Sequence, residues 1–398
     1  MAGTTEVVVI GGGYAGVMAA NRLTQRDDVT VTLVNSRPEF VERIRLHQLA
    51  GGTHGAVTDY RSVLGERVRL VVDTVTRIDA TGRGIELASG AKVGYDYLIY
   101  AVGSGSATPS VPGAAEFAHP IATFEEAQRL RSALDAAPAT AAVTVVGGGP
   151  TGIETAAELA EAGRAVTLVC GRVLGPYLHP KGRSSVAKRL AGLGVTVLEG
   201  PGVEVVEVTR DAVRLGDGRE LPSEVTVWTV GFGVPDLAAR SGLSTDAIGR
   251  LITDETLTSV DDERIVAAGD SAAPSDMPYR MSCQAAGPLG AHAADTVLGR
   301  IAGERPEPFD MGFAGQCLSL GRGTGLFQFA HKDDTAKKLS VGGWTGAKVK
   351  ELVCKLTVKQ LTSEARKPGS HTWVKGEKGR ALLRAQRREQ SAGSAPVA

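Results

Sequence analysis

Residues 6–16 read EVVVIGGGYAG, and this stretch decides the fold of the chain. The apolar, β-branched run after Glu6 stops at a glycine, as the buried strands of parallel sheets often do. A GxGxxG spacing follows, and residues 17–23 have the composition and spacing of a helix. Another apolar run at 29–34 completes a strand–loop–helix–strand unit. This order predicts a loop that binds a dinucleotide pyrophosphate, because its backbone N–H groups and helix N-terminus attract negative charge.

The same plan returns at residues 142–152, which read AVTVVGGGPTG. A helix is expected next at 153–162 and a strand at 165–169. The two halves match element by element, which indicates an internal duplication of one dinucleotide-binding unit.

Each half continues into short strands separated by turns, at 68–87 and at 203–215. An apolar strand that ends in glycine closes each half, at 97–103 and at 225–231. We therefore expect an α/β protein with two Rossmann-like dinucleotide-binding domains, each a parallel sheet with an antiparallel meander. A C-terminal α+β extension follows, with a glycine-rich hairpin at 315–329.

The glycines have separate roles in such a loop. The first permits the tight turn, the second lets the phosphates approach, and the third lets helix and strand pack closely. The predicted cofactor-binding residues of the two loops are Gly11, Gly13, Tyr14, Ala15 and Gly16, and Gly147, Gly149 and Gly152.

The ribose ends of the two sites depart from the usual pattern, in which an acidic residue lies about 20 positions after the loop. The first half offers Asn35, whose amide can hydrogen-bond a diol without charge assistance. The second half offers Cys170, with Arg172 close behind. A missing carboxylate beside an arginine favours a 2′-phosphate, so we slightly favour NADPH over NADH as the co-substrate. The alternative is that Arg172 is merely solvated.

These motifs resemble those of the two-dinucleotide-binding-domain flavoproteins, which share the pyridine nucleotide-disulfide oxidoreductase fold. Residues 95–103 and 225–231 resemble the two crossover strands of that family, and they add Gly103 and Gly231 to the predicted cofactor-binding residues. The resemblance implies FAD in the first domain and NAD(P)H, as co-substrate, in the second.

Two further motifs carry the resemblance towards the chemistry. Gly269-Asp270 resembles the motif whose aspartate hydrogen-bonds the ribityl chain of FAD, so both residues are expected to bind the cofactor. The segment from Gly149 to Glu154 resembles the family's nicotinamide-side loop. The resemblance therefore implies a catalytic role for Glu154 near the contact between flavin and nicotinamide. Its alternative role is that of a helix N-terminal acid favoured by the dipole.

The positions and spacing of the cysteines narrow the choice among branches of the family. Residues 40–49 contain no cysteine, which excludes the disulfide reductases and their CxxxxC motif. The cysteines are far apart and form no CxxC, which argues against a metal site or a redox dithiol. They also look poorly placed for a sulfide:quinone reductase. The four cysteines are Cys170, Cys283, Cys317 and Cys354.

The strongest resemblance is to type II NADH dehydrogenases and apoptosis-inducing-factor-like quinone oxidoreductases. Their AQxAxQ motif beside the flavin aligns with residues 283–288, where Gln284 fits the first glutamine and Pro288 replaces the second. The resemblance implies that Gln284 is catalytic on the acceptor side. We also expect Arg45 to contact the cofactor, with His47 as a weaker candidate for the acceptor side.

The expected domains follow from this reading. Residues 1–110 form the first part of the FAD-binding domain, 111–235 the NAD(P)H-binding domain, and 236–305 the second part of the FAD-binding domain. Residues 306–398 form a C-terminal interface region with a basic tail, in which Lys and Arg outnumber Asp and Glu.

The tail contains one helix of particular interest. Val349, Leu352, Val353 and Leu356 are predicted to share one helical face, opposite several lysines. Two alternatives stay open for this helix. It either lies on an anionic membrane surface or packs on the flavin domain ahead of a disordered basic end.

Composition limits the remaining functions. The formal net charge of the 398 residues is +0 and the sequence pI is about 7.1, so no global field draws in nucleic acid. No secretory signal or membrane-spanning run is visible, and we expect a cytoplasmic protein with optional peripheral contact at the inner face of the membrane. A homodimer is a further option.

The leading hypothesis is an NAD(P)H:quinone oxidoreductase that uses FAD. The first alternative is a tailoring oxidoreductase or a reductase that serves a redox partner. The second is a flavin redox sensor with slow turnover.

Overall fold

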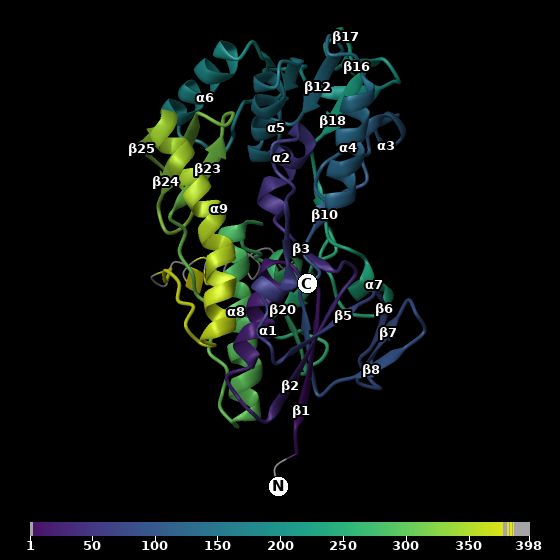
Figure 1. The fold of residues 1–398 in the computed structure, drawn as a ribbon, viewed down its shortest axis with the longest axis vertical. Coiled ribbons are helices and arrows are strands. Elements are labelled where there is room, and N and C mark those ends of the chain that lie inside the picture. The colour runs from purple at the N-terminus through teal and green to yellow at the C-terminus, as the bar shows by residue number, and fades with distance from the viewer. Residues whose placement is uncertain (1–2, 377–379, 382, 384, 386–398) are drawn as a thin grey trace, which may run out of the picture.

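The chain folds into two lobes with a long C-terminal helix along one side (Figure 1). We describe a computed structural model, whose described residues are 3–376, 380, 381, 383 and 385. The first lobe is built on a parallel sheet of order β21-β9-β1-β2-β5. Its strands are β1 (Thr5–Ile10), β2 (Val29–Asn35), β5 (Val68–Val72), β9 (Tyr97–Tyr100) and β21 (Ile265–Ala267).

The second lobe repeats this sheet with the order β11-β18-β12-β13-β14. Strand β12 lies between β13 and β18 as β1 lies between β2 and β9, and all of these pairs are parallel. The predicted duplication is therefore confirmed at the level of topology. The strands are β11 (Ala118–Pro120), β12 (Ala142–Val146), β13 (Ala165–Val169), β14 (Thr196–Leu198) and β18 (Val225–Trp228).

An antiparallel meander follows each parallel sheet, as expected. The strands are β6 (Val75–Asp79), β7 (Gly84–Leu87) and β8 (Lys92–Gly94) in the first lobe, and β15 (Val205–Val208), β16 (Ala212–Leu215) and β17 (Glu220–Pro222) in the second. One expectation was wrong, because residues 68–72 pair with β2 as an edge strand of the parallel sheet instead of joining the meander. Short apolar runs have the same local pattern in both settings, and only pairing separates them.

Helices cover the sheets, and two of them meet at close range. Helix α1 packs against α8, where a Cβ added at Gly290 would lie 2.1 Å from the carbonyl oxygen of Ala15. Helix α8 begins at Cys283, where Ser282 caps it by accepting from the N–H of Ala285. The helices of the two lobes are α1 (Tyr14–Leu23), α2 (Leu46–Gly51), α3 (Ala114–Phe117), α4 (Phe124–Ala136), α5 (Pro150–Glu161), α6 (Pro180–Gly192), α7 (Leu237–Arg240) and α8 (Cys283–Ile301).

Short elements complete the two lobes. Strands β10 and β19 pair antiparallel where the chain crosses between the lobes. The strands are β3 (Glu39–Val41), β4 (Val57–Asp59), β10 (Gly105–Ser106), β19 (Phe232–Gly233), β20 (Leu251–Thr253) and β22 (Ala272–Pro274). The 3₁₀ turns are η1 (Arg43–Arg45), η2 (Tyr60–Ser62) and η3 (Gly269–Ser271).

The C-terminal extension touches both lobes. The predicted hairpin is a three-stranded sheet of β23 (Gly315–Ser319), β24 (Gly325–Ala330) and β25 (Ala336–Gly342), and it leads into α9 (Gly343–Arg366). Helix α9 packs on β23, β24 and α1. The chain after α9 returns to the first lobe, where the buried carboxylate of Glu364 accepts from the N–H of His371 at 2.6 Å and pairs with Arg22 at 3.2 Å. On the other side, β23 packs on α5 and β25 on α6 of the second lobe, so the extension contacts both lobes.

Helix α9 does not bury the leucines of its predicted apolar face. Leu352 and Leu356 are exposed, whereas Lys350 and Cys354 point inward. Lys350 lies inward because it pairs with a buried acidic partner, described below. The end of the basic tail lies outside the described residues. Within the described part of the chain, no helix has the length and apolar character needed to cross a membrane.

Candidate active site

The first glycine loop is shaped by close backbone contacts. Gly11 has a φ of +100°, and a Cβ there would lie 2.3 Å from the carbonyl oxygen of Ala101. A Cβ at Gly16 would lie 1.8 Å from the carbonyl oxygen of Gly11. By contrast, a Cβ at Gly13 would meet no atom within 4 Å. Two glycines thus permit the packing, while Gly13 opens the space at the N-terminus of α1 where a phosphate can approach.

The second loop repeats this geometry. A Cβ at Gly147 would lie 2.3 Å from Oγ1 of Thr229, and one at Gly152 would lie 1.9 Å from the carbonyl oxygen of Gly147. A Cβ at Gly149 would again meet no atom within 4 Å. The two lobes therefore present two equivalent openings, each at the start of a buried helix.

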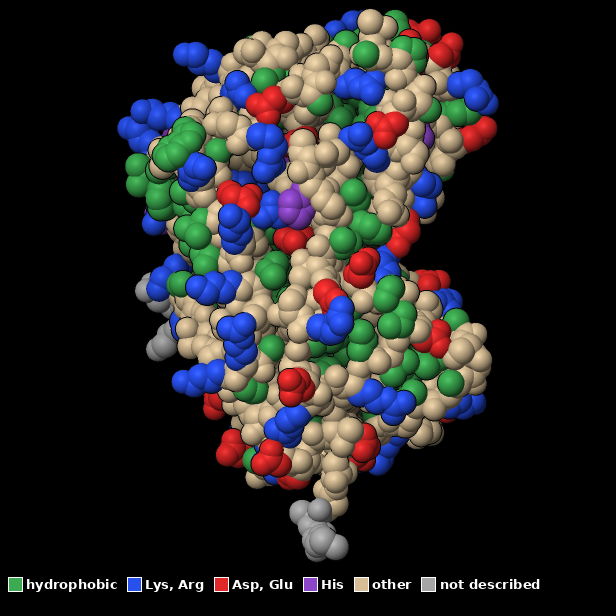
Figure 2. Space-filling model, viewed as in Figure 1, with side chains coloured by type: hydrophobic (Ala, Val, Ile, Leu, Met, Phe, Trp, Pro, Cys, Tyr) green, Lys and Arg blue, Asp and Glu red, His purple; other side chains and the backbone are tan. Residues whose placement is uncertain are grey.

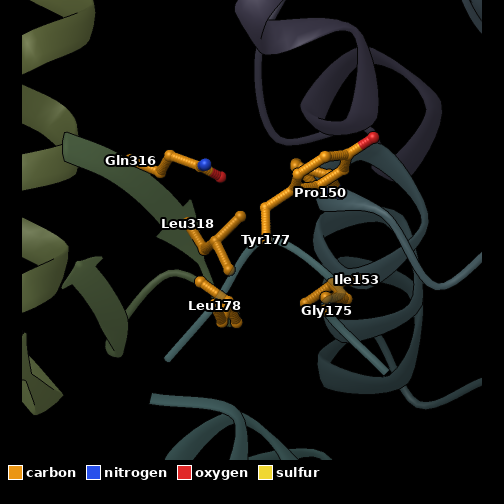
Figure 3. Close-up of a pocket in the computed structure, with 7 residues that line it drawn as sticks. All are labelled: Pro150, Ile153, Gly175, Tyr177, Leu178, Gln316 and Leu318. Carbon is orange, nitrogen blue, oxygen red and sulfur yellow. The ribbon is translucent and has the colours of Figure 1, made fainter. Parts of the chain in front are cut away.

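A narrow apolar crevice lies beside the second loop, between α5 and β23 (Figure 3). It has no room for a water molecule. The residues around it are Pro150, Ile153, Gly175, Tyr177, Leu178, Gln316 and Leu318.

Asn35 holds the first loop from the end of β2. Its Oδ1 accepts from the N–H of Gly12 at 2.9 Å, and its Nδ2 donates to the carbonyl oxygen of Arg37 at 2.9 Å. The hydroxyl of Tyr60 donates to the carbonyl oxygen of Gly12 at 2.7 Å. The structure thus gives Asn35 a part in shaping the loop, and its contact with a ribose stays a prediction.

Tyr14 and Ala15 have different surroundings in the first turn of α1. The ring of Tyr14 meets Phe40 edge-on, with 5.0 Å between centroids, and its buried hydroxyl has no partner among the described residues. Ala15 is buried at the contact with α8, and a Cβ at Gly269 would lie 2.8 Å from its Cβ. A side chain at position 269 would collide with Ala15, which explains why this residue is a glycine.

Asp270 belongs to a polar cluster between the lobes. Its Oδ2 accepts from Oγ of Ser104 at 2.7 Å and lies 3.3 Å from an Nη of Arg43. The Arg43 guanidinium also lies over the ring of Phe232, 5.7 Å from the centroid. Arg43 and Ser104 were missed in the sequence, because Arg43 and Asp270 are 227 positions apart and no spacing rule connects them.

The two crossover glycines flank this cluster. Gly103 immediately precedes Ser104, and Gly231 immediately precedes Phe232. A Cβ at Gly103 would meet no atom within 4 Å, whereas one at Gly231 would lie 3.3 Å from Cβ of Ala107. The structure therefore brings the ends of both crossover strands to Asp270.

Glu154 is the centre of the buried charge. Its Oε1 lies 2.8 Å from Nζ of Lys350 on α9 and accepts from the N–H of Ser319 at 2.8 Å. Burial alone would raise the pKa of Glu154, but Lys350 and the Ser319 N–H outweigh it and hold that pKa below its ordinary value. Burial would likewise lower the pKa of Lys350, and Glu154 raises it instead. Both groups are therefore charged near neutral pH.

His47 lies on the other side of Glu154. Its Nδ1 is 3.8 Å from Oε2 of Glu154, beyond hydrogen-bond distance, and its buried Nε2 has no partner among the described residues. Burial lowers the pKa of His47 to about 4, so the ring is neutral near neutral pH. A buried imidazole without partners calls for an explanation such as a ligand contact.

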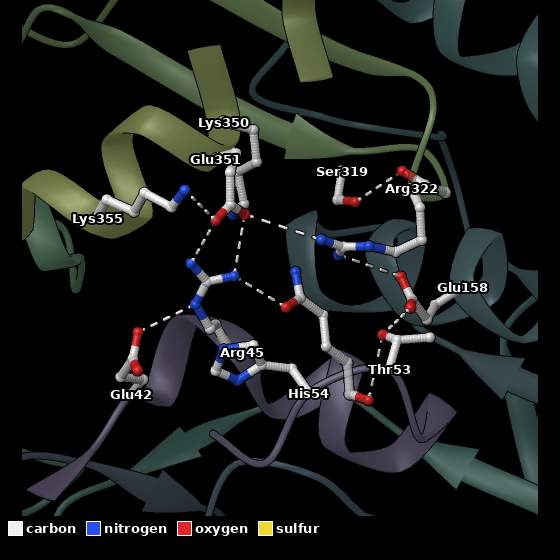
Figure 4. Close-up of polar contacts among 12 residues, drawn as sticks. Glu42, Arg45, Thr53, His54, Glu158, Ser319, Arg322, Lys350, Glu351 and Lys355 are labelled. Carbon is white, nitrogen blue, oxygen red and sulfur yellow. Dashed lines mark hydrogen bonds and ion pairs between the residues drawn. The ribbon is translucent and has the colours of Figure 1, made fainter. Parts of the chain in front are cut away.

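Arg45 binds side chains of the protein and does not face either glycine-loop opening with a free guanidinium (Figure 4). Its guanidinium donates to Glu42 at 3.0 Å, to Gln48 at 3.0 Å and to both carboxylate oxygens of Glu351 at 3.0 and 3.1 Å. Arg322 continues the network from Glu351. These contacts occupy Arg45 between α2 and α9 and do not support its expected contact with a cofactor.

Gln284 and Pro288 lie in the first turns of α8. In the amide orientation that satisfies both groups, Gln284 donates to the carbonyl oxygen of Gly315 at 3.2 Å and accepts from the N–H of Ala314 at 3.0 Å. Pro288 is buried inside the helix. Burial raises the pKa of the Cys283 thiol to about 12, and that of Cys354 to about 11. These cysteines are therefore protonated near neutral pH and are poor nucleophiles.

The remaining predicted residue is Arg172, which is exposed in the turn after β13. It lies beyond the end of that strand, where the ribose of a dinucleotide is expected in this fold. Across the described residues, no group of three His, Cys, Asp or Glu side chains is placed to hold a metal ion.

Two equivalent glycine-loop domains, the second of which carries the buried Glu154, are typical of dinucleotide-dependent oxidoreductases. The chain belongs to the pyridine nucleotide-disulphide oxidoreductase family, which matches residues 5–290. An NADH dehydrogenase-like protein of Mycobacterium tuberculosis is 32% identical over 324 residues, covering 74% of this chain and 80% of the relative. A type II NADH:quinone oxidoreductase of Staphylococcus haemolyticus is 26% identical over 373 residues, covering 84% and 92%.

Solved structures share the fold. NDH2 from Plasmodium falciparum in complex with NADH superposes with a TM-score of 0.75 at 15% identity, covering 92% of this chain and 99% of that chain. The sulfide:quinone oxidoreductase of Aquifex aeolicus has a TM-score of 0.75 at 20% identity, covering 90% and 92%. The predicted α/β fold with two dinucleotide-binding domains is thereby confirmed.

Proposed function

We propose that the protein binds FAD at its first glycine loop, takes hydride from NAD(P)H bound at its second, and passes electrons to a quinone. The observation that carries the proposal is the pair of equivalent openings at Gly13 and Gly149, the second of which lies at the start of the helix that carries Glu154. Relatives named NADH dehydrogenase-like protein and type II NADH:quinone oxidoreductase support it. The proposed division into two cofactor domains at residues 110, 235 and 305 is the one expected from the sequence.

The residues fit FAD in the first lobe. The open N-terminus of α1 suits a pyrophosphate, and Asp270 is a carboxylate that can accept from a ribityl hydroxyl once Ser104 or Arg43 turns away. The Arg43 cation adds a counter-charge for a phosphate. When bound, a flavin supplies the hydride-accepting chemistry that no side chain can perform.

The chain's own contribution lies in Glu154 and its partners. Lys350 and the Ser319 N–H bind Oε1 and hold the carboxylate in one orientation. Oε2 is then the oxygen left to accept from a carboxamide or to hold a proton, with the neutral His47 beside it. We therefore assign Glu154 to the nicotinamide side and Gln284 to the acceptor side.

A surface of α9 supports the membrane contact that a quinone substrate would require. Trp344, Leu352 and Leu356 are 67%, 55% and 40% exposed. Lys348, Lys355 and Lys359 are exposed on the same helix, and Figure 2 shows Lys and Arg side chains along this side of the molecule. Apolar side chains among lysines suit the surface of an anionic bilayer. The NADPH preference and the homodimer stay predictions.

The test is anaerobic stopped-flow reduction of the purified protein by NADH and by NADPH, followed by a pulse of short-chain quinone. We expect a flavin absorbance spectrum, fast bleaching and fast reoxidation. Protein that neither carries nor takes up flavin would overturn the proposal. Fast bleaching with slow reoxidation would reject the quinone and favour a partner-linked reductase or a redox sensor.

A further inference from the structure

The apolar crevice beside the second glycine loop has an aromatic side chain at its rim. Tyr177 is 57% exposed, and Figure 3 draws its ring beside Pro150, at the first position of α5. A large aromatic group left in solvent next to a predicted ligand site calls for a physical account, because aromatic rings gain much by burial.

The turn that carries Tyr177 is fastened to the glycine loop. The N–H of Gly175 donates to the carbonyl oxygen of Gly148 at 2.8 Å, and the N–H of Leu178 donates to the carbonyl oxygen of Gly175 at 2.9 Å. Pro176 occupies the second position of this four-residue turn, which suits its fixed φ. Leu178 is buried and anchors the turn to the core. Tyr177 is thus presented by a rigid turn.

The crevice lies on the path from the glycine loop to the buried acid. Pro150 and Ile153 belong to the first turn of α5, directly after Gly149 and directly before Glu154. On the other wall, Leu318 precedes Ser319, whose N–H binds Glu154. A dinucleotide with its pyrophosphate at Gly149 and its nicotinamide near Glu154 would pass along this rim, because Pro150 and Ile153 lie between those two residues in α5. Because the crevice has no room even for water, the ligand lies on it and not in it.

We propose that Tyr177 covers the nicotinamide half of bound NAD(P)H, with one face of its ring against that nucleotide and its edge against Pro150. This inference rests on the proposed dinucleotide site and adds a positioning residue to it. Tyr177 acts by packing, because its ring offers apolar area and a π face at low entropic cost. Gln316 directs its amide towards the same rim from β23 (Figure 3).

The test compares two ligands on the flavin-loaded protein by isothermal titration calorimetry. NAD⁺ has both halves, whereas ADP-ribose lacks the nicotinamide ring. We expect Tyr177→Ala to weaken NAD⁺ binding about tenfold, or about 1.4 kcal/mol, and to change ADP-ribose binding less than about twofold. Tyr177→Phe keeps the ring and should bind NAD⁺ within about threefold of the parent. In steady state, KM for the reduced dinucleotide should rise with kcat nearly unchanged.

The matched control is Val206→Ala, which removes an exposed apolar side chain from the meander of the same domain. An equal loss of affinity for NAD⁺ and ADP-ribose in Tyr177→Ala would show that the turn supports the glycine loop as a whole. Unchanged affinity for both ligands would show that Tyr177 does not contact the dinucleotide. Either result overturns this inference while the dinucleotide site stands. A parent protein that binds neither ligand would overturn the proposed site itself.

Discussion

Nζ of Lys350 lies 2.8 Å from Oε1 of Glu154, and each side chain is only 10% exposed. The pair joins the helix after the second glycine loop to the C-terminal helix, so the extension contributes directly to the candidate active site. A buried ion pair is costly to break from one side, because the remaining charge keeps its desolvation penalty.

Lys350→Met should therefore destabilise the protein by about 3–5 kcal/mol at pH 7, measured by urea unfolding at matched flavin content. The double variant Lys350→Met/Glu154→Gln should recover most of this loss, because no unpaired charge remains. The stabilisation by Glu154, whose folded pKa lies below 4.5, is present above pH 4.5 and is lost as pH falls through the folded value. The stabilisation by Lys350, whose pKa is raised from 10.5, is present below pH 10.5 and is lost as pH rises through the folded value. A double variant no more stable than Lys350→Met would contradict the pairing.

His47 should make the fold sensitive to mild acid. Its pKa falls from 6.5 to about 4 on folding, so the unfolded chain binds the proton more tightly. The stability it supports is present above pH 6.5 and is lost as pH falls towards 4, by about 3 kcal/mol in total. His47→Asn should flatten the stability profile over this interval, as measured by chemical unfolding at half-unit pH steps. An unchanged slope would mean that folding does not lower the pKa of His47.

The openings at the two loops predict variants that fold but do not bind. Gly13→Ala and Gly149→Ala add a Cβ that meets no protein atom, at φ values of −81° and −80° that alanine accepts. We expect unfolding temperatures near that of the parent, loss of flavin in the first variant, and at least tenfold weaker NAD⁺ binding in the second. Gly192→Ala on α6, which also meets no atom, is the control. Normal ligand binding by both loop variants would exclude phosphates from these openings.

Arg172 tests the choice of dinucleotide. If the exposed guanidinium binds a 2′-phosphate, Arg172→Ala should lower kcat/KM for NADPH about tenfold and leave that for NADH nearly unchanged. The ratio of the two values, measured at low ionic strength, isolates this effect from general damage. Equal changes in kcat/KM for both dinucleotides would show that Arg172 does not discriminate between them.

The exposed face of α9 predicts an effect on membrane binding alone. Leu352→Glu/Leu356→Glu replaces two exposed side chains, so stability should change by less than about 1 kcal/mol. Co-sedimentation with vesicles rich in anionic lipid should fall several-fold, because apolar insertion and charge attraction are both weakened. Val260→Glu, at a residue 58% exposed in the first lobe, is the control. If the parent protein does not sediment with vesicles, the exposed face of α9 is not a membrane-binding surface.

Most of the fold could be predicted from local patterns in the sequence. The two glycine loops could be located because their geometry depends on neighbouring residues, as the contact between Gly16 and Gly11 illustrates. The apolar strands before them could be located for the same reason. By contrast, the parallel pairing of Val68–Val72 with β2 depends on which strands meet, and the same short run could equally have entered the meander.

The sequence by itself determined that two dinucleotide loops of one design stand in one chain, and that Glu154 follows the second. Only the tertiary structure decided what surrounds these residues. The role of Lys350 could not be predicted from the sequence, because a lysine in an amphipathic helix is normally solvated. It is buried here because a carboxylate from another element pairs with it. Arg43 and Asp270, like Tyr177 and its crevice, combine distant segments. Side chains acquire such partners through packing, whose energy depends on contacts that no local pattern encodes.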